Sequence, residues 1–526
     1  MVVVMVSAAV MPGRCWPTAA LAGWPSSKCR AACCPALPVP KTLPSDVREP
    51  PMRFKSLLLL AAALAASPPL AARADTLPDA IAAAYEQNPD LRAQRAFVRQ
   101  ADEAVPQALA GGRPTLGTRL NADQAALDFK DNGRTYTAGL QLSQSLYQGG
   151  RIKTATSAAE NRIYAARARL RAAENQVVLN TVTAYADVLR FQRVVELNAN
   201  QVKVLERELQ ASKDRFEVGD LTRTDVAQSQ ARLANAQSNA VVAQNQLAAA
   251  RQAYLRVVGR LPEDLAPMPP LPVLPGTAGQ AVDIARDNSP AVIAARYDEA
   301  AARYDVKTLQ KQRLPTVAGT ASASYAYFEG GGGGANFVRQ GGFFSQDVAI
   351  TATVPLYQAG LVGSQVRQSQ ERRSQLMEAI TSASRANEES VTNAFNQLRA
   401  ARAVIEASRV AVEANTLAAE GVKQENQVGT RTIIELLNAE QERLTSEVNL
   451  VTARREEQVA AYSLLAAVGA AEAVALGVPV SEYDAVTNAQ KVRHRLLDDT
   501  SGGPAALPLP DKERASRSLV IGPPVP

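Results

Sequence analysis

The sequence EVGDLTRTDVAQSQARL occupies Glu217–Leu233, and a related sequence, VGTRTIIELLNAEQERL, occupies Val428–Leu444. The two share a glycine, a threonine and an acidic residue at positions 210 apart, namely Gly219, Thr222 and Asp225 in the first and Gly429, Thr432 and Glu435 in the second. Glycine is typical of a helix end, and Thr-x-x-Asp/Glu is typical of a helix start. Each stretch therefore predicts a tight turn between two helices, and its recurrence indicates two tandem repeats.

A second pair of related stretches supports the repeat and locates an insertion. LQLSQSLYQGGR (Leu140–Arg151) and ITATVPLYQAGL (Ile350–Leu361) are also 210 apart, whereas Asn88-Pro89 and Ser289-Pro290 are 201 apart. The nine extra residues of the second repeat must lie before Tyr357, where FEGGGGGANFVRQGG occurs at 328–342. We expect this glycine-rich stretch to be a longer loop.

The repeats set the expected domain boundaries. The first repeat covers residues 75–260, a proline-rich linker covers 261–276, and the second repeat covers 277–476. Residues 477–526 form a C-terminal tail that ends in Pro/Ser/Gly-rich sequence, which we expect to be partly disordered.

The N-terminal region has the features of an export signal. MRFKSLLLLAAALAASPPLAARA (52–74) combines a basic start, a short apolar run and an Ala-Arg-Ala end, and it predicts a mature start at Asp75. Residues 1–51 have no regular pattern, so we interpret them as an N-terminal extension from a start codon assigned too early, with Met52 as the preferred start.

Composition excludes several classes of function. Beyond Arg73 the chain has 49 basic and 49 acidic residues, which does not favour binding of nucleic acid. All four cysteines lie within residues 1–51, so disulfides, thiolate metal sites and catalytic thiols are excluded from the exported chain. The single histidine, His494, has no partner ligand and is expected to be a solvated tail residue. Gly330–Gly334 lacks the Lys-Ser/Thr ending of a phosphate loop. We therefore expect no enzyme activity, no cofactor and no metal site.

Each repeat predicts the same series of elements. An Ala-rich helical stretch is followed by a proline, by two runs with two-residue periodicity and by a very long helical pair. The expected helices are 77–109, 151–216 and 222–258 in the first repeat, and 280–312, 362–427 and 432–468 in the second.

The alternating runs predict the membrane location. One face of the clearest run carries Val348, Ile350, Ala352, Val354 and Leu356, and its other face is mostly small and polar. Runs at 317–327 and 136–143 alternate similarly, and 115–128 does so more weakly. Their length and alternation are typical of outer-membrane strands. Such strands must close into a barrel, because lipid cannot satisfy an open edge, and a barrel needs at least eight strands. Four strands cannot close, so copies of the chain must combine. A small soluble β-sandwich with a coiled-coil arm is the alternative.

LSQSLYQGGR, VGDLTRTDVAQSQARLANAQ and VGTRTIIELLNAEQERL resemble the repeat motifs of TolC-type outer membrane efflux proteins, and the resemblance extends over about 75–477. It implies an α+β membrane protein in which each repeat gives two transmembrane strands and a long antiparallel helical hairpin. It further implies a homotrimer with a twelve-stranded barrel in outer-membrane lipid and a twelve-helix tunnel through the periplasm. Such proteins are exit ducts of tripartite efflux pumps or type I secretion systems and dock onto a periplasmic adaptor and an inner-membrane transporter.

The resemblance also implies roles at the two turns. Asp225 and Arg431 fall on the family's gate positions, and Glu435 falls on one of two aspartates at the entrance constriction. The second of these is Asn438 here, and a gate tyrosine is replaced by Asn426. We expect Arg431 to contact Asp225 or Glu435. We also expect a single acidic ring to give weaker block by multivalent cations than in family members with two acidic rings.

The same turns have a purely structural interpretation. Thr222 with Asp225, and Thr432 with Glu435, would then only cap helices. By resemblance, Gly219 and Gly429 are instead adaptor-docking turns.

Two other classes of protein compete with the duct. A periplasmic adaptor would also be exported and helical, but it would have one long hairpin rather than two in tandem. A secreted enzyme with helical repeats is not supported by any grouping of nucleophile, base and metal ligand.

Overall fold

A computed structural model describes residues 75–127, 131–329 and 341–495 of the chain. In the first repeat its elements are α2 (Leu77–Gln87), α3 (Pro89–Asp102), α4 (Ala104–Ala110), β1 (Thr115–Leu127), β2 (Asp131–Tyr147), α5 (Arg151–Glu217) and α6 (Arg223–Val258). The second repeat contains α7 (Ala278–Asn288), α8 (Pro290–Gln310), the 3₁₀ turn η1 (Lys311–Arg313), β3 (Thr316–Glu329), β4 (Gly341–Thr353), α9 (Leu361–Gln427) and α10 (Ile433–Val468). A further helix, α11 (Ala485–Arg493), follows. The expected order of elements is thus observed twice.

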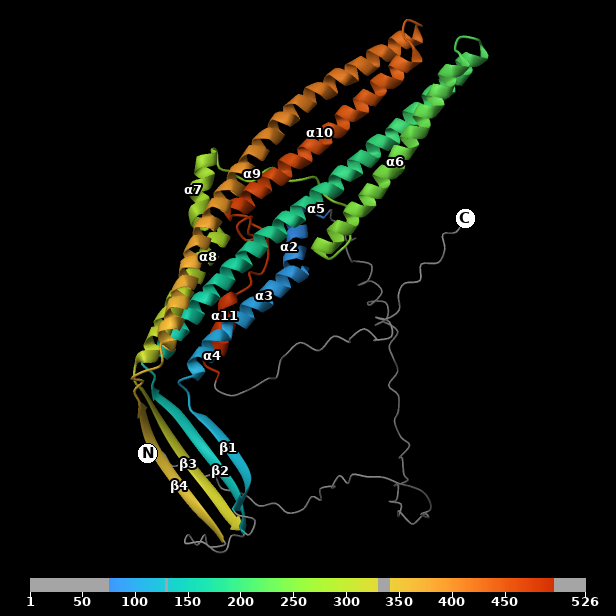
Figure 1. The fold of residues 1–526 in the computed structure, drawn as a ribbon. Coiled ribbons are helices and arrows are strands. Elements are labelled where there is room, and N and C mark those ends of the chain that lie inside the picture. The colour runs from blue at the N-terminus through green and yellow to red at the C-terminus, as the bar shows by residue number, and fades with distance from the viewer. Residues whose placement is uncertain (1–74, 128–130, 330–340, 496–526) are drawn as a thin grey trace, which may run out of the picture. The chain divides into compact units, whose positions relative to one another are not determined.

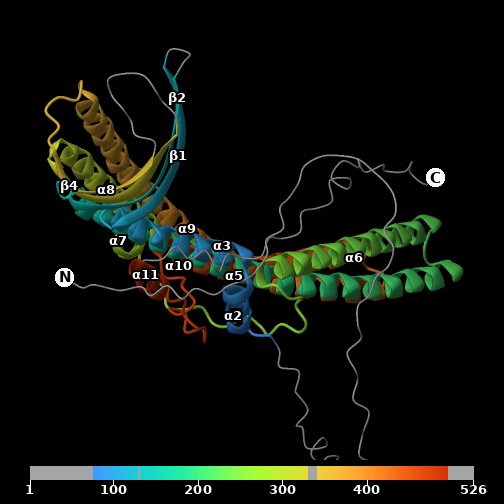
Figure 2. The same ribbon diagram turned by 90° about the horizontal axis from the view of Figure 1, so that it is seen from below.

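The four strands form one antiparallel sheet in the order β1-β2-β3-β4, seen as a curved layer in Figure 1 and Figure 2. β2 and β3 join the two repeats, with Leu140 opposite Ala323 in their register. β1 and β4 are the edges of the sheet, so within the chain each pairs on one side only.

One face of the sheet is apolar and exposed. Residues opposite one another in the register share a face, and in one such row Leu116, Leu142, Ala321 and Val348 follow one another across the four strands. Leu116 and Val348 are 73% and 83% exposed. The sheet thus presents an apolar surface that its own chain leaves uncovered.

The strand expected to run on to Leu356 is shorter than predicted. β4 ends at Thr353, because Pro355 has no N–H to donate and restricts the preceding residue, Val354. The glycine-rich insertion at 330–340, including Gly330–Gly334, lies outside the described residues.

The two long helical pairs are observed with nearly the expected bounds. α5 packs antiparallel along α6, and α9 packs along α10, as Figure 1 shows. α5 also packs on α10, which makes the two hairpins one layer in the order α6, α5, α10, α9. In the part of the chain that the structure describes, no helix is both long and apolar enough to cross a bilayer.

The shorter helical stretches are broken where continuous helices were expected. Asn88 ends α2 and caps α3 by accepting hydrogen bonds from the backbone of Asp90 and Leu91, and Ser289 separates α7 from α8. A proline follows each of these residues and favours an extended conformation there. α2 and α3 pack on α5 around a core that includes Tyr185, Tyr254 and Leu91. α7 packs on α9 around a second cluster, which includes Ala285 and Val391.

The segment after Gly477 packs against the first repeat before the description ends at Arg495. Asn488 of α11 donates a 2.8 Å hydrogen bond to the buried carboxylate of Asp102, and burial raises the pKa of that carboxyl. Arg113 donates to the carbonyl oxygens of Arg493 and Arg495 at 3.1 and 2.7 Å. The composition of the tail gives no sign of this packing. His494 ends α11 and is exposed.

Candidate functional site at the hairpin turns

The turn between α5 and α6 is built by a glycine and a capping box. Gly219 has φ +83°, and its N–H donates to the carbonyl of Phe216 while the N–H of Asp220 donates to that of Arg215. This pair of bonds is the Schellman motif, which satisfies the last carbonyls of a helix. The Asp225 carboxylate then accepts from the Thr222 N–H at 3.0 Å and from its hydroxyl at 2.7 Å, which starts α6.

The turn between α9 and α10 repeats this construction. Gly429 has φ +80° and donates to Asn426, and the N–H of Thr430 donates to Glu425. Glu435 accepts from the N–H and hydroxyl of Thr432 at 2.9 and 3.0 Å. Both expected capping boxes therefore form. The space around Gly219 and Gly429 is open, since a Cβ added at either would meet nothing within 4 Å.

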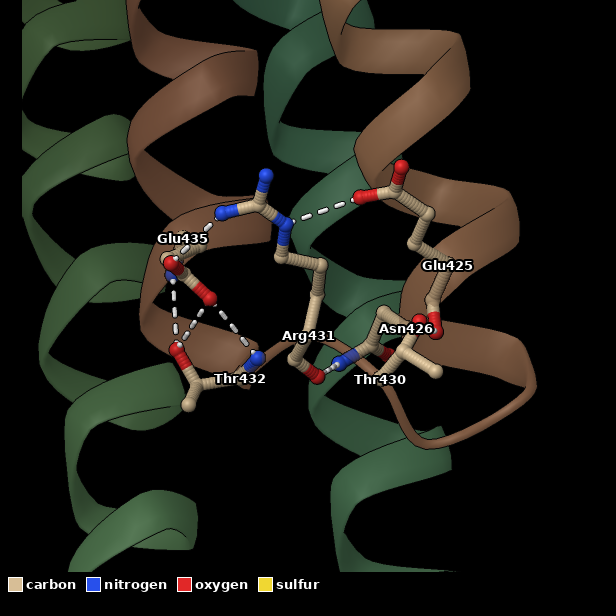
Figure 3. A network of polar contacts seen from close by, with 6 residues as sticks. All are labelled: Glu425, Asn426, Thr430, Arg431, Thr432 and Glu435. Carbon is tan, nitrogen blue, oxygen red and sulfur yellow. Dashed lines mark hydrogen bonds and ion pairs between the residues drawn. The ribbon is translucent and has the colours of Figure 1, made fainter.

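Only the second turn carries an arginine between two acids, as Figure 3 shows. Arg431 Nε donates to Glu425 Oε2 at 2.8 Å, and its Nη1 donates to Glu435 Oε1 at 3.0 Å. The bonds from the Thr432 backbone, the Thr432 hydroxyl and Arg431 hold the pKa of Glu435 below its usual value. The Arg431 and Glu435 side chains are 47% and 43% exposed, so the network faces solvent.

Asn426 connects this turn to the first hairpin. It is buried, its amide nitrogen donates to the Arg431 carbonyl at 2.8 Å (Figure 3), and its amide oxygen accepts from Arg215 of α5 at 3.2 Å. Asn426 is thus a polar link between the last turns of α5 and α9.

Asn438 makes a second link between the hairpins. Its amide oxygen accepts a 2.7 Å hydrogen bond from Arg232 of α6. Between the two links, side chains from both hairpins form an apolar cluster of Leu205, Ala236, Ile433, Leu436 and Leu437. Lys423 adds an ion pair to Glu208 at 3.6 Å.

The structure brings together part of the predicted set of residues. Arg431 contacts Glu435, and in the described chain Asp225 is bound to its own cap rather than to Arg431. The residue 210 positions before Arg431 is Leu221, so the first turn has no counterpart of the arginine.

Sequence reasoning missed Glu425, Arg215 and Arg232. Glu425 is six residues from Arg431 across a turn, and the two arginines lie in the other repeat, so no helical spacing points to them. Within the described ranges, no group of three His, Cys, Asp or Glu side chains could hold a metal ion.

Comparison with known proteins gives consistent matches over both repeats. The model of the family described as "Outer membrane efflux protein" matches residues 80–260 and 281–470. The outer membrane efflux protein BepC of Brucella suis biovar 1 is 33% identical over 413 residues, which are 78% of this chain and 89% of BepC. The outer membrane protein TolC of Escherichia coli K12 is 27% identical over 400 residues, or 73% of this chain and 80% of TolC.

A solved structure matches the fold as well. The crystal structure of the Campylobacter jejuni CmeC outer membrane channel superposes with a TM-score of 0.66 at 14% identity, over 80% of this chain and 89% of CmeC. At this identity the likeness concerns the fold alone.

Proposed function

The chain belongs to the outer membrane efflux protein family, and we propose that three copies of it form a duct through which substrates leave the cell. The family resemblance, the outer-membrane location and the role in efflux inferred from the sequence are confirmed by this membership. The periplasmic-adaptor alternative is not supported by the relatives.

The open sheet is the observation that carries the proposal of an oligomer. β1 and β4 each leave one edge unpaired, and the apolar face of the sheet is exposed. In lipid an unpaired edge costs several kcal/mol per group, so β1 of one copy must pair with β4 of another. Closure needs more than one copy, and family resemblance sets the number at three, which gives a barrel of twelve strands.

The helices of the three copies would also close into a ring, because each layer has two outer helices that can meet those of the next copy. Since α6 and α9 are the outer helices of the layer, α6 of one copy would meet α9 of the next, and twelve helices would surround a passage. The hairpin turns then surround its periplasmic mouth. Glu435 would occur three times there, and a ring of carboxylates favours cations.

The gate of this duct consists of the links between the hairpins. Widening the mouth requires the hairpins of each chain to separate, which breaks the contacts of Arg215 with Asn426 and of Arg232 with Asn438. Arg431 and Glu435 rigidify the second turn and set the charge at the mouth.

The partners of the duct are a periplasmic adaptor and an inner-membrane transporter. The turns at Gly219 and Gly429 offer open space to an adaptor, and their shared geometry gives each chain two equivalent docking turns. The complex would serve as an efflux pump or as a type I secretion system.

Cell fractionation tests the assembly. We expect heat-sensitive trimers in the outer-membrane fraction, with a boiled sample running as the single chain. Recovery of the protein as soluble periplasmic monomers would rule the duct out.

A further inference from the structure

An arginine-lined pocket lies between the two hairpins, far along the helices from their turns. It has a volume of about 500 Å³ and is formed by α5, α9, α10 and Met268 of the segment between α6 and α7. This volume suits a small molecule. Its charged walls hold a single carboxylate, Glu457, and five arginines, Arg190, Arg193, Arg409, Arg454 and Arg455.

Arg455 is a fixed part of the wall. Its Nε and Nη2 donate to the two carboxylate oxygens of Asp187 at 3.0 and 3.1 Å, and its Nη1 donates to Glu456 at 2.9 Å. All three nitrogens are therefore used, and the two-oxygen geometry locks the orientation of the guanidinium.

Two further arginines are also matched by acids. Arg193 pairs with Glu196 at 2.6 Å and Arg409 pairs with Glu406 at 2.8 Å, each one turn along its own helix. The pocket carboxylate, Glu457, accepts from Arg402 at 3.3 Å.

The remaining two arginines are not matched in this way. Arg454 makes no ion pair or hydrogen bond to any residue that the structure describes. Arg190 forms only a long ion pair with Asp187, at 3.8 Å from Nε to Oδ1, and this Nε is buried without a hydrogen-bond acceptor. Its guanidinium lies over the ring of Phe191, 4.1 Å from the centroid, which limits its freedom to turn toward another acid.

A buried acceptor lines the same pocket. Gln458 Oε1 is buried and has no donor within the described chain. A buried donor or acceptor left unpaired is unfavourable, so a ligand that pairs with both kinds of group would be favoured.

These groups together define the chemistry of a ligand. We propose that the pocket binds a small carboxylate that also carries a hydroxyl or amine group. Its carboxylate would accept from Arg190 and Arg454, as guanidinium groups prefer, and its hydroxyl or amine would donate to Gln458 Oε1. This site is separate from the turns and does not depend on the gate.

Isothermal titration of the purified, detergent-solubilised full-length protein with citrate at low salt tests the site. We expect one citrate per chain and a loss of affinity of about tenfold in Arg454→Gln and in Arg190→Gln. Arg399→Gln is the matched control, because Arg399 is an exposed arginine of α9 without a partner in the described chain and does not line the pocket. It should bind citrate as the unaltered protein does.

Tricarballylate, which is citrate without its hydroxyl group, tests the second contact. It should bind the unaltered protein about fivefold more weakly than citrate, and Gln458→Met should abolish that difference. Arg454 is exposed, so Arg454→Gln remains informative even where a change at the half-buried Arg190 disturbs folding. Absence of citrate binding at millimolar concentration, or equal losses in Arg454→Gln and Arg399→Gln, would overturn the proposal.

Discussion

The amide oxygen of Asn426 accepts a hydrogen bond from Arg215 at 3.2 Å, and this contact joins the last turn of α9 to the last turn of α5. The same asparagine donates to the carbonyl of Arg431. One buried side chain thus holds the second turn in shape and ties it to the other repeat.

Replacing Arg215 with alanine should favour the open duct. A hydrogen bond from a charged group contributes about 1 kcal/mol at such a half-exposed site, so the ratio of open to closed states should rise about fivefold for each chain whose link is removed. Single-channel recordings in planar bilayers measure this ratio. Arg223→Ala is the control, since Arg223 lies in the first turn of α6 and makes no hydrogen bond or ion pair across the hairpins in the described chain. Equal open times in both variants would show that the link does not hold the mouth closed.

Glu435→Gln should lower the preference for cations, because it removes the carboxylate from the mouth. Reversal potentials in a potassium chloride gradient measure this preference, and Glu425→Gln, which alters the other partner of Arg431, is the control. An unchanged reversal potential in Glu435→Gln would mean that this residue does not line the constriction.

Acidification should abolish the cation preference of the unaltered channel only below pH 4.5. The pKa of Glu435 lies below the usual 4.5, so its carboxylate stays charged as the pH falls through that value. Cation preference should persist at pH 4.5 and be lost below it, as the pH falls through the lowered pKa of Glu435. Loss of preference that is complete above pH 4.5 would point to a different carboxyl group.

Asn438→Asp should increase block by multivalent cations only slightly. Arg232 already donates to Asn438 at 2.7 Å and would pair with a new carboxylate there, which offsets its charge. The double variant Asn438→Asp with Arg232→Gln should increase the block about tenfold, since its carboxylate has no such partner. Block of single channels by a trivalent cation distinguishes the two, and a full increase in the single variant would contradict the assigned contact.

A bulky side chain in place of Gly429 should impair export without preventing formation of the trimer. A side chain there meets open space, and the positive φ costs about 1–2 kcal/mol, which a large trimer can tolerate. Gly429→Phe should therefore keep trimers on an unheated gel and lose export in a strain whose own copy is deleted. Gly429→Asn, which accepts positive φ and adds less bulk, should retain most of the export. Normal export by Gly429→Phe would exclude this turn as a docking surface.

The sequence alone predicts the local features of this fold well. The helix from Arg151 was expected to end at Phe216 and ends at Glu217, because the Val-Gly step and the Thr-x-x-Asp pattern mark both sides of the turn. The break at Glu103 between α3 and α4 was missed, although Pro106 indicates it, because a proline has no N–H to donate to the carbonyl of Asp102, the last residue of α3.

Contacts between the repeats could not be predicted. Arg215 and Asn426 are 211 residues apart, and their meeting depends on how α5 packs against α10 and α9 rather than on any local spacing. The resemblance to a family identified Asn426 and Asn438 as departures from its pattern, but only the structure assigns an arginine to each.

Disulfide cross-linking between β1 and β4 tests the central claim, a barrel closed by several copies, most directly. The sequence has no cysteine after Cys34, so cysteines can be placed singly in β1 at Thr118 and Leu120 and combined with cysteines in β4 at Val348 and Ile350. Leu140→Cys with Ala323→Cys, partners within one sheet, is the control and should cross-link only inside the chain. The account predicts that β1–β4 pairs give covalent dimers and trimers in outer membranes. If none of the β1–β4 cysteine pairs gives a cross-link between two chains, the account is contradicted.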